Sequence, residues 1–122
     1  MKTDIVAVFA TASLIAGSAM VIATSAAAID MPELAKINSC TACHAIDKKI
    51  VGPAWMDVSK KYKGATKYTY NGKEYGLEEG LIVKVSKGGS GNWGTMPMPA
   101  NAPAVKAADI KELVQFILRL AK

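Results

Sequence analysis

The chain contains few residues that bind metal ions or act as catalytic bases. It has one histidine and two cysteines among 122 residues. A structural zinc site takes four ligands, mainly cysteine and histidine, so a zinc site built on the cysteine pair would here need carboxylates to complete it, which is an unusual set. The sequence also shows no internal repeat and no low-complexity tract. These absences direct attention to the one place where the scarce residues occur.

Both cysteines and the single histidine lie in one short motif, Cys40-Thr41-Ala42-Cys43-His44. The spacing Cys-x-x-Cys-His is the attachment signature of a c-type haem. Two thiols one helical turn apart can each add to a vinyl group on the same porphyrin edge, and the next residue is then held beneath the iron. The sequence therefore predicts one covalent haem c attached through Cys40 and Cys43, with His44 as an iron ligand.

Two other uses of a Cys-x-x-Cys pair fit the surrounding sequence less well. A thioredoxin-like dithiol follows a hydrophobic strand in a βαβ unit, whereas residues 32–37 have the pattern of a short helix. A structural disulfide between Cys40 and Cys43 would close a very small loop and leave His44 unexplained.

Residues 1–28 have the pattern of a secretory signal peptide. After a positive start, no charged residue occurs from Ile5 to Ala28, and Ala26 and Ala28 form an Ala-x-Ala cleavage site. We expect cleavage after Ala28, which leaves residues 29–122 as one domain. A retained anchor is the alternative, since the uncharged stretch could span a bilayer, but it is rich in Ala, Ser, Thr and Gly.

Export agrees with the haem motif, because c-type haem is attached on the outer side of the bacterial inner membrane. We therefore expect a periplasmic protein with no membrane contact after cleavage. The leader contains one lysine and one aspartate, so its removal leaves the formal net charge at +5, before haem propionates lower it.

The lysines of the domain are scattered, with small groups at Lys48-Lys49 and at Lys60-Lys61 with Lys63. Nucleic-acid binding is therefore not expected. Two interpretations of the positive charge stay open: a solvated surface, or a field that steers an acidic redox partner.

Hydrophobic periodicity predicts four helices in the domain. They are expected at residues 31–38, 53–62, 77–87 and 104–120. Asp30 is placed to cap the first helix, and Pro53 suits the opening of the second. Gly88-Gly89 is expected to end the third.

A small β-hairpin is predicted near residues 68–75. Asn71-Gly72 lies between two alternating aromatic and polar arms, and both residues tolerate the positive φ of a type I′ turn. Because two strands alone are marginally stable, Tyr68, Tyr70 or Tyr75 should pack on the body of the protein. We interpret the hairpin as a tolerated insertion, with a docking surface as the functional alternative.

The absence of a second histidine limits the other iron ligand to methionine or lysine, unless that position is open. Of the four methionines after the leader, two lie close to the haem motif or on its proximal side. Met96 and Met98 remain. Pro97 and Pro99 bias Met98 to an extended conformation and reduce the entropy that it loses on binding. We predict Met98 as the ligand and Met96 as a side chain packed on the ring edge.

Several motifs occur in a characteristic order after the haem motif. They are Val51-Gly52-Pro53-Ala54, Gly88-Gly89-Ser90-Gly91-Asn92-Trp93-Gly94, and Pro97-Met98-Pro99 with Asn101. In order and spacing this pattern resembles the small bacterial monohaem class I cytochromes c, over nearly all of the domain.

The resemblance implies an all-α, four-helix cytochrome c fold wrapped around one covalent haem. It implies that Met98 is the distal ligand and that Pro53 offers its carbonyl to His44, which fixes the imidazole ring. It also implies that the indole N–H of Trp93 reaches a haem propionate.

The chain departs from the family pattern at two places. The segment from Tyr68 to Tyr75 lengthens the loop before the third helix. Asn38-Ser39 stands where many members have a small glycine against an aromatic residue of the last helix, so the contact between Phe116 and the first helix is left open.

A haem with His and Met ligands has no open position for a substrate, which suits electron transfer. We therefore expect a monomeric one-electron carrier, not an enzyme, whose redox partner proteins have acidic docking surfaces. One alternative is a haem subunit docked on an oxidoreductase complex. The other is a peroxidase-like or gas-sensing protein whose Met98 detaches, but no histidine remains after His44 to act as its acid or base.

Overall fold

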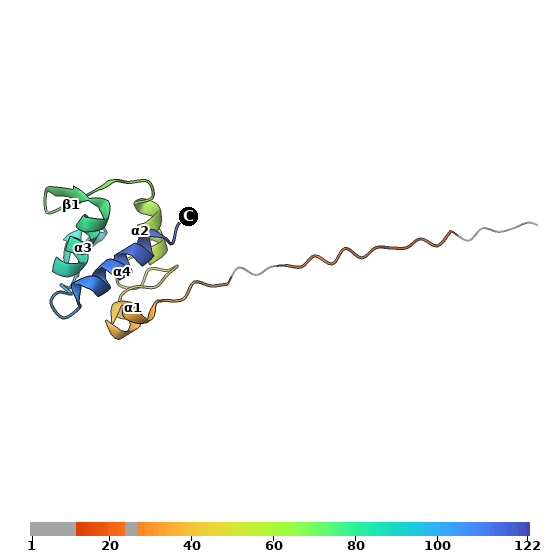
Figure 1. Ribbon diagram of the computed structural model, residues 1–122, viewed down its shortest axis with the longest axis horizontal. Helices are drawn as coiled ribbons and strands as arrows, with labels where there is room; N and C mark the ends of the chain where they lie inside the picture. Colours follow the sequence, from red (N-terminus) through yellow and green to blue (C-terminus); the bar gives the residue numbers. More distant parts are fainter. Residues whose placement is uncertain (1–11, 24–26) are drawn as a thin grey trace, which may run out of the picture.

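The computed structural model describes residues 12–23 and 27–122 (Figure 1). The helices in these residues are α1 (Glu33–Ile37), α2 (Trp55–Lys61), α3 (Leu77–Lys87) and α4 (Ala107–Leu118), with a 3-10 turn, η1 (Cys40–Ala42), after α1. Two antiparallel hairpins accompany them: β1 (Lys67–Tyr70) with β2 (Lys73–Gly76), and β3 (Gly89–Gly91) with β4 (Gly94–Met98). The four helices and the first hairpin confirm the predicted fold class. The second hairpin was not predicted.

Residues 12–23, which belong to the predicted leader, do not join the folded domain. Residues 12–23 contain no helix or strand, their side chains are exposed, and Figure 1 shows them leading away from the body of the protein. Residues 1–11 and 24–26 lie outside the described residues, and they include Ala26 of the expected cleavage site. Cleavage of the leader therefore stays a prediction. Within the described ranges, no helix has the length and apolarity needed to cross a membrane.

Three of the four helices are shorter than predicted. Helix α1 begins after Pro32 without a side-chain cap, so the prediction of Asp30 as its cap was wrong. Helix α2 begins at Trp55 and leaves Pro53 outside. Helix α4 begins at Ala107 because the preceding residues form a separate turn, in which the Val105 N–H donates to the Asn101 carbonyl over 2.8 Å.

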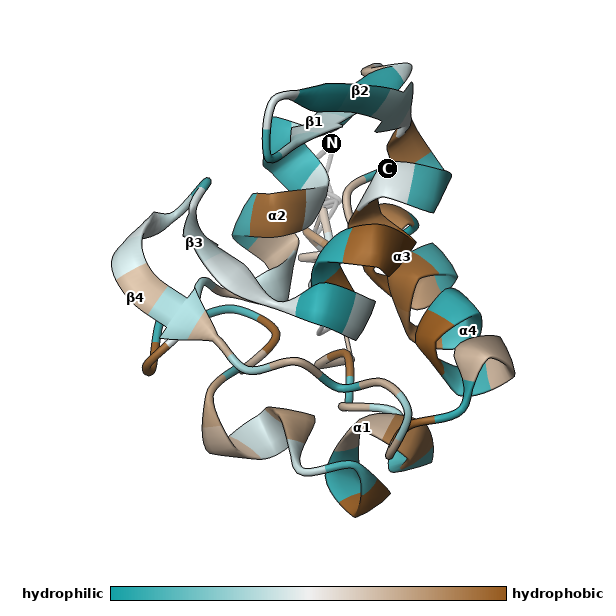
Figure 2. Ribbon diagram, turned by 90° about the vertical axis from the view of Figure 1, so that its left-hand side faces the viewer, coloured by the Kyte–Doolittle hydropathy of each residue, from teal (hydrophilic) through white to brown (hydrophobic). Residues whose placement is uncertain are grey.

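Helix α4 connects two hydrophobic clusters. The first lies between α1, α2 and α4 and contains Ala35, Trp55, Val58, Leu113, Ile117 and Leu120. The second lies between β1, α3 and α4 and contains Tyr68, Leu81, Val105, Ile110 and Val114. Figure 2 shows α3 and α4 side by side with hydrophobic residues along both, whereas the β1–β2 hairpin is mostly hydrophilic. The two clusters hold the helices that surround the site.

The ring of Phe116 packs in the cluster that α1, α2 and α4 share. Phe116 packs on that cluster, where its ring meets Trp55 edge to face with centroids 6.0 Å apart. The small residue that α1 contributes to the cluster is Ala35, which is fully buried. The position of Asn38-Ser39 therefore does not prevent α1 from packing against α4.

The β1–β2 hairpin has the predicted turn and a firm attachment. Asn71 and Gly72 have φ values of 47° and 78°, as a type I′ turn requires. Tyr68 is only 4% exposed, and its ring lies edge to face on Tyr62. A Cβ added to Gly80 would lie 2.7 Å from the Cβ of Tyr68. Gly80 therefore occurs within α3 because the hairpin packs directly on the helix backbone there.

The β3–β4 hairpin brings Met98 into an extended conformation, as the flanking prolines suggested. Gly89 pairs with Met98 and Gly91 with Gly94, with an irregularity between the two pairs. Strand β4 contains Pro97, and proline is restricted to edge strands. A two-stranded sheet has only edge strands, so Pro97 is tolerated in β4. The same proline made a strand hard to predict from the sequence.

Candidate functional site

A pocket lies in the middle of the folded domain, and we call it the central pocket. All six residues predicted as site residues line it: Cys40, Cys43, His44, Pro53, Trp93 and Met98. Apolar side chains from three helices form much of the remaining wall: Trp55, Val58, Leu81, Val85, Leu113, Val114 and Ile117. The residues predicted from separate motifs thus converge on one apolar cavity.

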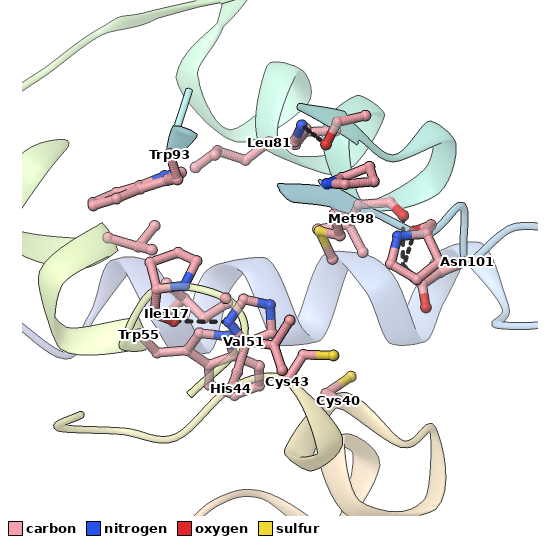
Figure 3. A pocket seen from close by; sticks show the side chains of 18 of the residues that line it. Cys40, Cys43, His44, Val51, Trp55, Leu81, Trp93, Met98, Asn101 and Ile117 are labelled. Carbon is pink, nitrogen blue, oxygen red and sulfur yellow. Dashed lines mark hydrogen bonds between the residues drawn. The ribbon is translucent and has the colours of Figure 1, made fainter. Parts of the chain in front are cut away.

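The two thiols lie at one edge of the central pocket. A helical turn begins at Cys40, whose carbonyl accepts the N–H of Cys43 over 3.2 Å and that of His44 over 2.9 Å. The cysteines are half-buried and are not joined by a disulfide, and Figure 3 shows both sulfur atoms on the same side, next to His44. Burial raises the pKa of the Cys40 thiol. This turn presents two thiols to one edge of a bound group.

A zinc centre at these cysteines finds no support in the surrounding residues. Across residues 12–23 and 27–122, no group of three or more His, Cys, Asp and Glu side chains is arranged to hold a metal ion.

The imidazole of His44 is held in one tautomer. Its Nδ1 lies 2.8 Å from the carbonyl oxygen of Pro53, and because a carbonyl can only accept, Nδ1 carries the proton and donates it. Nε2 therefore keeps its lone pair and can bind a metal. Behind the ring, a Cβ added to Gly52 would lie 2.6 Å from Cε1, so the loop backbone packs against the imidazole.

Met98 approaches the central pocket from the opposite side. Figure 3 shows its sulfur directed toward His44 across the cavity, with the two cysteines on the His44 side. Met98 is half-buried, whereas Met96 is 63% exposed although it also lines the pocket. Just after β4, the side-chain amide of Asn101 donates to the carbonyl of Val85 over 3.0 Å. This bond holds the end of the strand on α3.

Trp93 lies at the turn between β3 and β4, and its side chain is 38% exposed. The Nζ of Lys61 lies 4.5 Å from the centroid of the indole ring and donates to the carbonyl of Asn92 over 3.0 Å. Helix α2 therefore holds this turn through one lysine. Sequence reasoning missed this contact and treated Lys61 as part of a scattered lysine group.

Lys84 is a second pocket residue that sequence reasoning missed. It lines the cavity and donates from Nζ to the carbonyl of Gly89 over 2.6 Å. Partial burial lowers the pKa of its ammonium group. Lys84 follows Leu81 by three residues, so the two side chains lie on neighbouring positions of one helix face. This spacing in the sequence could have predicted Lys84 as a pocket residue.

The donor set fits a covalent haem. The cavity has apolar walls for a macrocycle, two thiols at one edge, and an imidazole whose free nitrogen is defined by the bond to Pro53. A soft thioether lies on the other side. If a haem is bound here, Cys40 and Cys43 would hold the porphyrin, and His44 would bind the iron.

Comparisons with known proteins agree with this chemistry. The sequence profile described as "Cytochrome c" matches residues 32–121. Cytochrome c-551 of Allochromatium vinosum is 47% identical over 103 residues, which cover 84% of this chain and 97% of that protein. Cytochrome c-552 of Nitrosomonas europaea is 39% identical over 122 residues, covering 98% and 99% of the two chains.

The fold agrees as well. The crystal structure of wild-type Nitrosomonas europaea cytochrome c552 superposes with a TM-score of 0.59 at 40% identity, over 71% of this chain and 95% of that one. The family match spans the central pocket and the four helices around it. The chain therefore belongs to the cytochrome c family, as a small class I monohaem cytochrome that carries electrons with one covalently attached c-type haem.

Proposed function

We propose that this cytochrome is a periplasmic one-electron carrier whose iron is bound by Nε2 of His44 and the sulfur of Met98. The observation that carries the proposal is the opposition of these two side chains across the central pocket. Imidazole paired with thioether raises the reduction potential of a haem. Such a pair suits a carrier that accepts and returns an electron.

The haem supplies an iron that gains and loses one electron, and the protein keeps its surroundings constant. The bond to Pro53 fixes the His44 ring, and the attachment of Asn101 to α3 fixes the strand that carries Met98. With His44 and Met98 as ligands in both oxidation states, little rearrangement would accompany electron transfer. The apolar wall of the pocket would limit the access of water to the iron.

We propose that the protein has no catalytic activity of its own, because few side chains near the central pocket could act as a general acid or base. The chain has one histidine, and the bond to Pro53 already commits its Nδ1 proton. Apart from His44, the described residues place no histidine and no carboxylate in the wall of the central pocket, so an acid or base of the kind that peroxidase chemistry uses is not supplied on the Met98 side. If Met98 nevertheless detached readily, carbon monoxide would bind promptly to the reduced protein at neutral pH, and this result would favour the enzyme or sensor alternative.

The proposed docking surface lies on the loop between His44 and Pro53. Ile50 and Val51 are 46% and 45% exposed, and Lys48 and Lys49 precede them with exposed side chains. An exposed apolar pair beside two lysines suits a short-lived complex with an acidic redox partner. We also propose that the cytochrome acts as a monomer.

Two further assignments belong to the same proposal. The indole N–H of Trp93 is proposed to donate to a haem propionate, since Trp93 lines the central pocket at the β3–β4 turn. Export to the periplasm with cleavage after Ala28 is supported by the leader pattern of residues 1–28.

Optical spectroscopy of the holoprotein tests the ligand assignment. The oxidised protein should show a methionine–iron charge-transfer band that disappears in Met98→Ala and persists in Met96→Ala. The variants are matched, because both remove a thioether from the same strand. Loss of the band in Met96→Ala alone would transfer the ligand role to Met96. A wild-type spectrum without the band would overturn His/Met ligation.

A further inference from the structure

We propose that the β1–β2 hairpin positions the methionine side of the iron site, and that it acts through the hydroxyl group of Tyr70. This inference rests on the proposed ligation by Met98. It replaces the interpretation of the hairpin as an insertion tolerated in a surface loop. Tyr70 is thus a positioning residue, since it acts through the backbone of the strand that bears the ligand.

The first observation is the end of β1, where the Tyr70 hydroxyl donates to the carbonyl of Gly88 over 3.0 Å. Tyr70 is half-buried at this contact. The next carbonyl, that of Gly89, accepts from Nζ of Lys84 over 2.6 Å. Two consecutive carbonyls at the start of the β3–β4 hairpin are therefore held by side chains from two other elements.

The second observation is the position of Gly88 directly against the backbone of Met98. Gly88 is buried with φ 72°, and an added Cβ would overlap the carbonyl oxygen of Met98 and lie 2.7 Å from the carbonyl carbon of Pro99. The neighbouring Gly89 pairs with Met98 in the sheet. A shift of the backbone at Gly88 is therefore transmitted to Met98.

The third observation is that the hairpin provides a fixed support. Tyr68, two residues before Tyr70 on the same strand, is buried against Gly80 of α3 and against the ring of Tyr62. The strand therefore cannot slide on α3 without opening this packing. A hydroxyl on such a strand restrains Gly88 more firmly than solvent would.

The substitution Tyr70→Phe in the holoprotein tests the proposal, because it removes the hydroxyl and keeps the ring. Cyanide binds to the oxidised haem only when the methionine ligand leaves, so its binding rate reports that departure. We expect Tyr70→Phe to raise this rate about two- to tenfold, the effect of one lost hydrogen bond. Tyr75→Phe is the matched control, since Tyr75 lies on the partner strand opposite Tyr68, and its rate should equal the wild-type rate.

A second readout separates positioning from general stability. In a denaturant titration, the methionine–iron band of Tyr70→Phe should be lost earlier relative to the helical circular dichroism than in the wild type. Parallel shifts of both signals, or a cyanide rate equal to that of Tyr75→Phe, would overturn the inference. Failure of the underlying ligand assignment would give a different result. If Met98 were not the ligand, Met98→Ala would bind cyanide at the same rate as the wild type.

Discussion

The Nδ1–H of His44 donates a 2.8 Å hydrogen bond to the carbonyl oxygen of Pro53, nine residues later in the chain. This bond selects the tautomer of the ring and leaves Nε2 as the atom that faces the central pocket. The loop between the two residues is also closed by the N–H of Gly52, which donates to the carbonyl of Cys43 over 2.8 Å. The loop thus holds the imidazole of His44 in one orientation.

Gly52→Ala should destabilise the holoprotein by about 1 to 3 kcal/mol, the typical result of overpacking. The new Cβ would lie 2.6 Å from Cε1 of His44, and the ring is restrained by the bond to Pro53. The measurement is the free energy of unfolding from denaturant titration. Gly76→Ala is the control, because Gly76 has φ −57° and no atom within 4 Å of an added Cβ. Equal stabilities of the two variants would show that Gly52 does not brace the ring.

Gly80→Ala should destabilise the protein by about 1 to 3 kcal/mol, although the same change within an exposed helix stabilises by about 0.5 to 1 kcal/mol. The reason is the Tyr68 side chain, whose Cβ and Cδ1 would lie 2.7 and 2.8 Å from the new methyl group. Thermal and denaturant unfolding measure the effect. Glu79→Ala, at the adjacent exposed position, should stay within about 0.5 kcal/mol of the wild type. A stabilised Gly80→Ala protein would mean that the hairpin does not pack tightly on α3.

The buried phenol of Tyr68 should lower the free energy of unfolding in alkaline solution. Burial is the main cause that raises the pKa of Tyr68 well above its ordinary value of 10.0, and the neighbouring Tyr62 adds to it. Above pH 10 the unfolded chain loses the phenolic proton while the folded protein keeps it, so the free energy of unfolding decreases as the pH rises. Tyr68→Phe should show a smaller decrease than the wild type. Unfolding of the reduced protein, followed by circular dichroism on both sides of pH 10, provides the measurement, and identical pH profiles would contradict the prediction.

Removal of two lysine charges beside the exposed apolar loop should weaken the salt dependence of electron transfer. The test compares Lys48→Gln/Lys49→Gln with Lys106→Gln/Lys111→Gln, two variants that lose the same charge from exposed positions. Reaction with anionic hexacyanoferrate is followed by stopped flow at several ionic strengths. Charges within about one Debye length of the contact, about 8 Å at physiological ionic strength, dominate the slope. We expect a reduced slope for the first variant only, and equal slopes would remove the docking role of Lys48 and Lys49.

Local patterns in the sequence were sufficient for much of the fold. Helix α3 has the predicted bounds, Leu77–Lys87, because a regular apolar period ends there at glycine. Asn71-Gly72 identified the first hairpin, since a type I′ turn depends on two adjacent residues. The β3–β4 hairpin was missed because its second strand contains Pro97 and its first is mostly glycine, so neither strand carries an alternating apolar pattern.

The sequence by itself determined the haem attachment motif and the lack of a second histidine, because these depend only on residue identity and short spacing. Only the tertiary structure decided which other long-range pairs meet: Lys61 with Trp93, and Tyr70 with Gly88. Such pairs join residues far apart in the chain, and their meeting depends on how α3 and α4 pack and where the hairpins attach. Local propensity contains no information on that packing, whereas the folded chain specifies it through buried contacts such as Tyr68 on Gly80.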